Sequence, residues 1–238
     1  MTRRRWIADR WNEERTSASL LGEQAAHLAR VLRAERGQVF DVVAGGFLHR
    51  AEVESVSDEE VKFILHEEQE SDAALPVHLL LAVFKFDHME WAIEKATELG
   101  VAGVTPIVAR RTEKHLAHAA AKRVERWRRI ALEAAKQSRR TDVPEIGDPL
   151  SLKDALKMDF AGAKILLAET EQENSLTAVL GDARGDVALA IGPEGGWTPE
   201  EMKAFSDAGW KHATLGPRIL RAETAAIAGL AVVASLIG

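Results

Sequence analysis

Two glycine-bearing segments contain the residue types most able to hold a small ligand. Residues 191–196 read Ile-Gly-Pro-Glu-Gly-Gly, and residues 215–221 read Leu-Gly-Pro-Arg-Ile-Leu-Arg. Each segment follows an apolar run and precedes a stretch that predicts a helix. Because glycine has no side chain, a ligand can approach the backbone N–H and C=O groups of such a turn directly. In open α/β sheets, ligands bind beyond the carboxyl ends of the strands, where these turns would lie.

The first segment favours a cationic ligand over a phosphate. Glu194 is acidic, and no Lys-Ser/Thr pair follows, so the segment is neither a G-x-G-x-x-G turn nor a phosphate-binding Walker loop. A carboxylate suits a sulfonium or an amino group. A tight strand–helix turn with no ligand explains the glycines equally well. For the second segment, the alternative is that Ile219 and Leu220 are core residues and the flanking arginines are solvated.

The elements around these segments predict an α/β domain. Apolar runs predict strands over residues 77–84, 104–108, 163–168, 186–191 and 214–215. Helices are predicted over residues 87–99, 119–138, 199–208 and 222–236. Asp87 is the expected N-cap of the first of these helices, and Thr198 followed by Pro199 is typical of a helix start. Alternating strands and helices predict a parallel sheet covered on both faces.

The first 75 residues predict a smaller, β-rich domain. Strands are expected over residues 39–43, 47–56 and 60–66, with Gly45-Gly46 as a hairpin turn. A helix is expected over residues 20–33. The polar, acidic stretch 67–75 precedes Pro76 and marks a domain boundary, giving domains 1–74 and 75–238.

Charge is unevenly distributed along the chain, whose formal net charge is −6. Residues 110–141 contain eleven basic residues against three acidic ones, and residues 1–36 contain eight arginines against five acids. Nine acids lie between Glu52 and Asp72. Basic surfaces on an acidic body can bind nucleic-acid phosphates locally. For a generic helix, a solvated, salt-bridged face is the more common explanation.

Several functional classes are excluded or disfavoured. The chain has no cysteine, which excludes disulfides, thiolate zinc sites and a cysteine nucleophile. It has no apolar run of about 18 residues that would span a membrane and no apolar segment behind its basic N-terminus that would make a secretory signal. His115 and His118 have no carboxylate at metal-ligand spacing, so no metal is expected. These features fit a cytoplasmic protein.

Five segments together resemble a known family. The two glycine-bearing segments, the second extended to Ala225, resemble SPOUT methyltransferases. Residues 90–101, 126–140 and 27–33 narrow this to the ribosomal RNA small subunit methyltransferase E family, bacterial enzymes that methylate uracil N3 in 16S rRNA. The resemblance covers nearly the whole chain. Two places depart from the family pattern: Phe86 stands where glycine is common, and residues 110–114 are less apolar than expected.

The resemblance implies both architecture and partners. It predicts an α/β SPOUT domain with a trefoil-knotted parallel sheet, preceded by a small PUA-like β-barrel that binds RNA. S-adenosylmethionine would lie bent in the knot loops, and the protein would act as a homodimer. Its substrate would be 16S rRNA or the small ribosomal subunit, with no membrane and no metal involved.

The expected site residues fall into three groups. Cofactor binding is assigned to Ile191, Gly192, Pro193, Glu194, Gly195, Gly196, Leu215, Gly216, Ile219, Leu220 and Arg221. RNA binding is assigned to Arg3, Arg4, Arg5, Arg30, Arg33, Arg110, Arg111, Arg123, Arg126, Arg139 and Arg140. The catalytic candidates are Arg221, Glu223 and Glu194.

Neutral uridine carries a proton on N3, so the enzyme must either remove this proton or polarise the neighbouring carbonyl groups. Each catalytic candidate could perform one of these tasks. Arg221 is the candidate for stabilising charge. Glu223 is either the base or a cap of the last helix, and Glu194 is either the base or a cofactor contact. Two alternatives stay open: a SPOUT methyltransferase acting on another RNA position, and a non-catalytic RNA-binding or ribosome-assembly protein.

Overall fold

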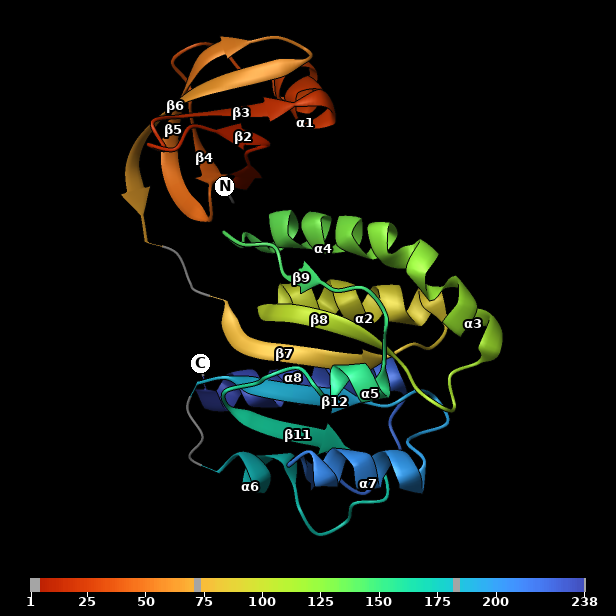
Figure 1. Cartoon of the computed structure of the whole chain (residues 1–238). Coiled ribbons are helices and arrows are strands. Elements are labelled where there is room, and N and C mark those ends of the chain that lie inside the picture. The colour runs from red at the N-terminus through yellow and green to blue at the C-terminus, as the bar shows by residue number, and fades with distance from the viewer. Residues whose placement is uncertain (1–4, 71–73, 182–184, 238) are drawn as a thin grey trace. The chain divides into compact units, whose positions relative to one another are not determined.

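The computed structural model describes residues 5–70, 74–181 and 185–237 (Figure 1). The chain forms two compact units. One comprises Met1–Ala73 with Ala135–Asp142, and the other comprises Ala74–Ala134 with Val143–Gly238. Arg3 and Arg4, which we expected to bind RNA, lie outside the described residues. Within the described parts of the chain, no helix is both long and apolar enough to cross a membrane.

The first unit is built on a six-stranded sheet with the strand order β1-β4-β5-β6-β3-β2. Its strands are β1 (Arg5–Ile7), β2 (Arg10–Trp11), β3 (Ser17–Leu21), β4 (Val39–Ala44), β5 (Phe47–Val56) and β6 (Glu60–Gln69). The predicted hairpin is confirmed, since β4 and β5 pair antiparallel around Gly45 and Gly46, both at positive φ. Strands β1 to β3 were not predicted, because β1 and β2 have only three and two residues and the end of β3 was assigned to the helix over residues 20–33.

The helix predicted over residues 20–33 was wrong at its start. Leu20 and Leu21 belong to β3, where Leu20 pairs with Val61 of β6 and is fully buried. Gly22 ends the strand at a φ of +51°. Helix α1 (Gly22–Ala26) follows and continues into a π-helical turn over His27–Val31. The sequence pattern thus predicted the helix correctly from Gly22 onward, but its first two residues pair with β6 as part of a strand.

The second unit confirms the predicted α/β class. A seven-stranded sheet has the order β10-β8-β7-β12-β11-β13, with β9 paired to β8, and all recorded pairings are parallel. Its strands are β7 (Leu75–Ala82), β8 (Val101–Val108), β9 (Glu145–Ile146), β10 (Leu150–Ser151), β11 (Ala163–Leu167), β12 (Val187–Ile191) and β13 (Lys211–Ala213). The strand expected at 214–215 therefore lies slightly earlier, and Thr214 makes only an isolated bridge to Ser175.

The helices of this unit are α2 (Phe86–Glu98), α3 (Lys114–Ala119), α4 (Val124–Ser138), α5 (Leu152–Ala155), α6 (Leu176–Leu180), α7 (Pro199–Asp207) and α8 (Ala222–Ile237). The helix predicted over residues 119–138 is divided, because a 3-10 turn at Ala120–Arg123 precedes α4. Asp87 is not the N-cap of α2, since the helix begins at Phe86 after Lys85. The last turn of α4 groups with the first unit.

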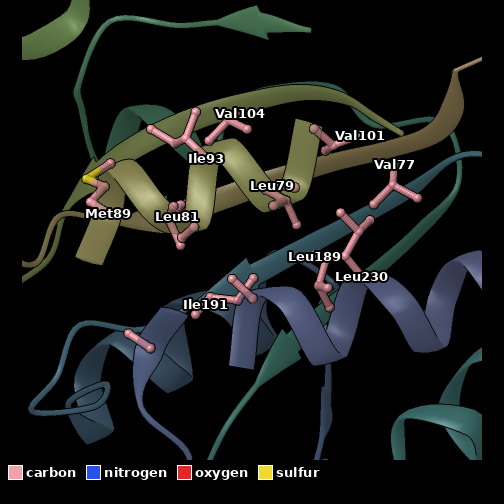
Figure 2. Close-up of a cluster of buried hydrophobic side chains, with 14 of the residues drawn as sticks. Val77, Leu79, Leu81, Met89, Ile93, Val101, Val104, Leu189, Ile191 and Leu230 are labelled. Atoms are coloured by element: carbon pink, nitrogen blue, oxygen red, sulfur yellow. The ribbon is translucent and has the colours of Figure 1, made fainter. Parts of the chain in front are cut away.

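Alternating residues of the central strands fill two separate cores. Leu79, Leu81, Leu189 and Ile191 lie on the face that packs against α2 and α8, as Figure 2 shows. Their neighbours Leu80, Ala82, Ala188 and Ala190 lie on the opposite face with Trp197, Phe205 and Trp210. Successive side chains of a strand point to opposite faces, so a strand that is apolar throughout must be covered on both.

Candidate functional site

Both glycine-bearing segments line one cavity of about 700 Å³. The first segment follows β12, and the second follows β13. The end of β11 also contributes, through Ala168, Glu169 and Thr170. These three strands are parallel neighbours in the sheet, with β11 between the other two, so their carboxyl ends meet at one edge. Gly195 is the one member of the predicted cofactor set that does not line this cavity.

The first loop is a tight turn whose glycines have little room for side chains. Gly196 has a φ of +69°, and its N–H donates to the carbonyl of Pro193 at 2.8 Å. A Cβ atom at Gly196 would lie 2.9 Å from Oε1 of Glu169. A Cβ atom at Gly192 would lie 3.0 Å from Nε1 of the buried Trp197. The loop therefore depends on glycine for both its conformation and its packing.

Helix α7 begins at Pro199 after the N-cap Thr198, as predicted, and a capping box that was not predicted anchors the end of this loop. The Glu201 N–H donates to Oγ1 of Thr198 at 3.3 Å, and the Thr198 N–H donates to Oε2 of Glu201 at 2.9 Å. The other carboxylate oxygen of Glu201 accepts from the N–H of Arg110 at 2.7 Å. Glu201 is 5% exposed. One buried carboxylate thus ties the start of α7 to the loop that follows β8.

The second loop leaves its polar and apolar side chains open to the cavity. Gly216 has a φ of +119°, and Thr214 Oγ1 accepts from its N–H at 3.1 Å. Ile219 is 81% exposed, so it is not a core residue. Arg218 and Arg221 are also exposed, and neither guanidinium group forms a hydrogen bond or ion pair with another described residue. The rim of the cavity therefore carries two guanidinium groups that a ligand or substrate can use.

Carboxylates balance these cations around the cavity. Glu194 lies 3.7 Å from Nζ of Lys85 and is 36% exposed. Arg111 donates from Nη1 to the carbonyl of Gly195 at 2.6 Å, which links the loop after β8 to the first glycine loop. Glu169 also lines the cavity. The mixture of charges suits a ligand that is itself zwitterionic or cationic.

Glu223 is the most buried charged group of the site, at 3% exposed. Its Oε1 lies 3.1 Å from Nδ1 of His88. Among the described residues, no backbone N–H is recorded as a donor to either carboxylate oxygen, so the observed contacts do not support the helix-capping alternative. We did not predict His88 from the sequence. Its position just beyond the carboxyl end of β7, in the first turn of α2, was the available signal.

The arginines around α4 are largely paired. Arg126 donates to both oxygens of Glu90, and these hydrogen bonds raise the pKa of Arg126 above its ordinary value. Nη1 of Arg123 lies 3.9 Å from the same carboxylate, and its guanidinium stacks on the ring of Phe86. The basic helix is therefore partly the salt-bridged face that the sequence left as an alternative.

The arginines of the first unit that we predicted to bind RNA differ in their exposure and in whether they already have a partner. Arg140 is 9% exposed and binds Asp142. Arg5 donates to the backbone carbonyl of Arg139. Arg30 pairs with Asp58 at 2.7 Å, whereas Arg33 is exposed, with a φ of +51°.

Comparison with known proteins gives a consistent result. The family model described as RNA methyltransferase domain matches residues 71–234. The chain is 34% identical to ribosomal RNA small subunit methyltransferase E of Bacillus subtilis, covering 93% of this chain and 91% of the relative. It is 31% identical to the protein of that name from Mycobacterium tuberculosis, covering 90% and 85%.

Solved structures extend the similarity to the fold. Ribosomal RNA small subunit methyltransferase E of Neisseria gonorrhoeae, bound to S-adenosyl methionine, superposes with a TM-score of 0.87 at 28% identity, covering 100% of this chain and 99% of that one. A Legionella pneumophila protein described as a methyltransferase, in complex with the same cofactor, gives a TM-score of 0.84 at 30% identity, covering 99% and 98%.

Proposed function

This chain belongs to the ribosomal RNA small subunit methyltransferase E family, and on that premise we propose that it methylates N3 of a specific uridine in 16S rRNA. It is an S-adenosylmethionine-dependent enzyme that acts on the RNA of the small ribosomal subunit. The observation that carries the proposal is the single cavity that both glycine loops line, with Arg221 and Glu223 in its wall.

The residues of the cavity fit S-adenosylmethionine. A volume of about 700 Å³ is in the range of small-molecule pockets. Gly192, Gly196 and Gly216 line the cavity, and because they have no side chain the adenine and methionine parts could approach the backbone of these turns. Glu169, Glu194 and Glu223 supply negative charge for a ligand with a sulfonium and an ammonium group. We assign cofactor binding to the two loops, with Gly195 acting through its bond to Arg111.

The protein's residues then have separate tasks in the reaction. When bound, the cofactor supplies an electrophilic methyl group. The guanidinium group of Arg221, which is exposed and has no partner among the described residues, stabilises the negative charge that develops on the uracil carbonyls. Glu223 accepts the N3 proton. Glu194, held near Lys85, contacts the cofactor.

RNA recognition is assigned to the basic residues of both units. Arg110, Arg111, Arg123 and Arg126 would meet phosphates from the methyltransferase unit, and Arg5, Arg30, Arg33, Arg139 and Arg140 from the other, with Arg3 and Arg4 outside the described residues. Phosphate contacts position an RNA without reading its sequence. The choice of uridine is therefore attributed to the pocket and to the N-terminal domain.

The finer architecture also belongs to the proposal. We assign residues 1–74 to a PUA-like barrel and residues 75–238 to a SPOUT domain with a C-terminal trefoil knot. The all-parallel sheet and the two adjacent glycine loops support the second assignment. We expect a homodimer, because apolar residues of α8 such as Val232 and Ile237 are only half-buried. The reaction would take place in the cytoplasm, where ribosomal RNA is made.

Nucleoside mass spectrometry tests the proposed target. Ribosomal RNA from a strain that lacks this gene should lose 3-methyluridine, and the intact gene should restore it. Loss of a different methylated nucleoside would instead support a SPOUT enzyme that acts on another RNA position. The purified protein should be assayed on naked 16S rRNA and on small subunits, because this comparison identifies the form of the substrate.

A further inference from the structure

Three residues that line the cavity have a buried polar atom with no hydrogen-bond partner among the described residues. One is Nε1 of Trp197, beneath the first glycine loop. The other two lie together: Nδ1 of His88, in the first turn of α2, and Oε2 of Glu223, in the first turn of α8. Nδ1 lies 3.1 Å from the other carboxylate oxygen, Oε1. Burial of an unpaired carboxylate oxygen is costly, so such a group usually has a function.

The two side chains are held by rigid elements. Met89, which follows His88, is fully buried, as are Ile93 on α2 and Leu230 on α8. Figure 2 shows these residues of α2 and α8 packed in one cluster with the central strands. The imidazole of His88 lies between two carboxylates. Its Nδ1 faces the buried Glu223, and its Nε2 lies 3.7 Å from the exposed Asp87. Asp87 and Glu223 are the charged groups recorded within contact distance of the ring.

We infer that His88 is a positioning residue that holds Glu223 as the acceptor for the proton of the substrate. This inference rests on the proposed function. With Nδ1 against Oε1, Oε2 is the carboxylate oxygen that has no partner among the described residues, and Glu223 lines the cavity. Glu194 is less suited to this task, because it is 36% exposed and lies beside Lys85.

The N3–H bond of the uracil breaks, and its proton passes to Oε2 of Glu223. The electron pair that remains on N3 forms the bond to the methyl carbon. The bond between that carbon and sulfur breaks, and its pair stays on sulfur, which becomes an uncharged thioether. His88 takes no proton in this step and only fixes the orientation of the carboxyl group.

Steady-state kinetics and calorimetry on the full-length protein test the inference. We expect His88→Ala to lower kcat about tenfold or more, with the KM and the calorimetric Kd for S-adenosylmethionine changed by less than about twofold. His88→Asn should recover most of kcat, because its amide nitrogen can take the place of Nδ1. His115→Ala is the matched control, since His115 lies 3.5 Å from Glu113 in an exposed pair outside the cavity.

The inference also predicts how Glu223 behaves. Glu223→Gln should lower kcat about a hundredfold, within the usual range for a general base, and adding His88→Ala should cause little further loss. Should His88→Ala fail to fold, His88→Leu, which fills the same space without a donor, takes its place.

Three results would overturn the inference. They are wild-type kcat in the His88 variant that lacks a donor, no recovery in His88→Asn, and a Glu223→Gln variant that binds cofactor tenfold more weakly with kcat retained. Failure of the wild-type protein to methylate ribosomal RNA would instead overturn the proposed function.

Discussion

The guanidinium group of Arg126 donates two hydrogen bonds to the carboxylate of Glu90, from Nε at 2.6 Å and from Nη2 at 2.7 Å. Arg123 approaches the same carboxylate at 3.9 Å. Glu90 therefore offsets part of the positive charge that makes this helix a candidate RNA surface. The side chains of Arg126 and Arg123 are 59% and 44% exposed, so RNA phosphates can reach both guanidinium groups.

Replacement of Glu90 should strengthen RNA binding. In Glu90→Gln, both guanidinium groups become available to phosphates, and each added phosphate contact should steepen the slope of log affinity against log salt by about 0.7 to 0.9. Titration of a 16S rRNA fragment at several salt concentrations measures this slope. Glu125→Gln is the control, because its partner Arg128 is also held by Asp148 and the carbonyl of Ile146. An unchanged slope in Glu90→Gln would show that Arg123 and Arg126 do not meet RNA.

Charge reversal at Arg139 should weaken RNA binding without affecting the cofactor. Arg139 is half-exposed, whereas Arg140 is buried against Asp142, so reversal of both would also disturb folding. We expect Arg139→Glu to weaken binding uniformly across RNA sequences and to reduce the salt slope by about one contact. Affinity for S-adenosylmethionine, measured by calorimetry, should stay at the wild-type value. A wild-type salt slope would remove Arg139 from the RNA surface.

Alanine substitutions at two glycines should separate the effect of backbone strain on stability from the effect of the first loop on cofactor binding. Gly196 and Gly209 both have positive φ, at +69° and +81°, but only Gly196 lines the cavity. Alanine at either position should cost about 1–2 kcal/mol of stability through the left-handed backbone. Gly196→Ala should in addition weaken S-adenosylmethionine binding, because its Cβ atom would displace Glu169. Equal cofactor affinity in the two variants would contradict the role of the first loop.

Stability should depend on pH through His78. Burial is the main cause that lowers the pKa of His78 below its ordinary value of 6.5, and the charge of Glu145 partly opposes this. A lowered pKa means that the unfolded chain binds the proton more readily than the folded chain does. The neutral ring therefore contributes stability above pH 6.5 that is lost as the pH falls toward the folded-state pKa. Urea unfolding between about pH 5 and 7.5 should show a flatter profile for His78→Gln than for the wild type; parallel profiles would exclude His78 as a cause.

Local signals made the second unit largely predictable. The apolar strand β12 and the capping box at Thr198 involve neighbours in the sequence, so their patterns are complete before any tertiary contact forms. The start of α2 was less predictable, because Lys85 precedes the helix without a side-chain cap. Leu20 shows the opposite case, in which pairing with a distant strand overrides a helical pattern.

The sequence allowed the two glycine loops and the charged residues Glu194, Arg221 and Glu223 to be assigned to one site, but not their contacts with distant elements. Both loops carry their signal in residue type and position. The contact of His88 with Glu223 joins two helices that lie far apart in the sequence, and no spacing rule links them. The pairing of Arg126 with Glu90 is hidden for the same reason, because a charge count cannot show which cations already have partners.

The buried carboxylate of Glu201 couples the local opening of two segments beside the cavity. One of its oxygens accepts a hydrogen bond from the backbone amide of Thr198, at the start of α7. The other accepts from the backbone amide of Arg110, beyond the end of β8. Neither amide can exchange its hydrogen with solvent while this buried side chain stays in place. Two segments that are remote in the sequence should therefore open in a single event, governed by the rotation of one glutamate rather than by the unfolding of either segment.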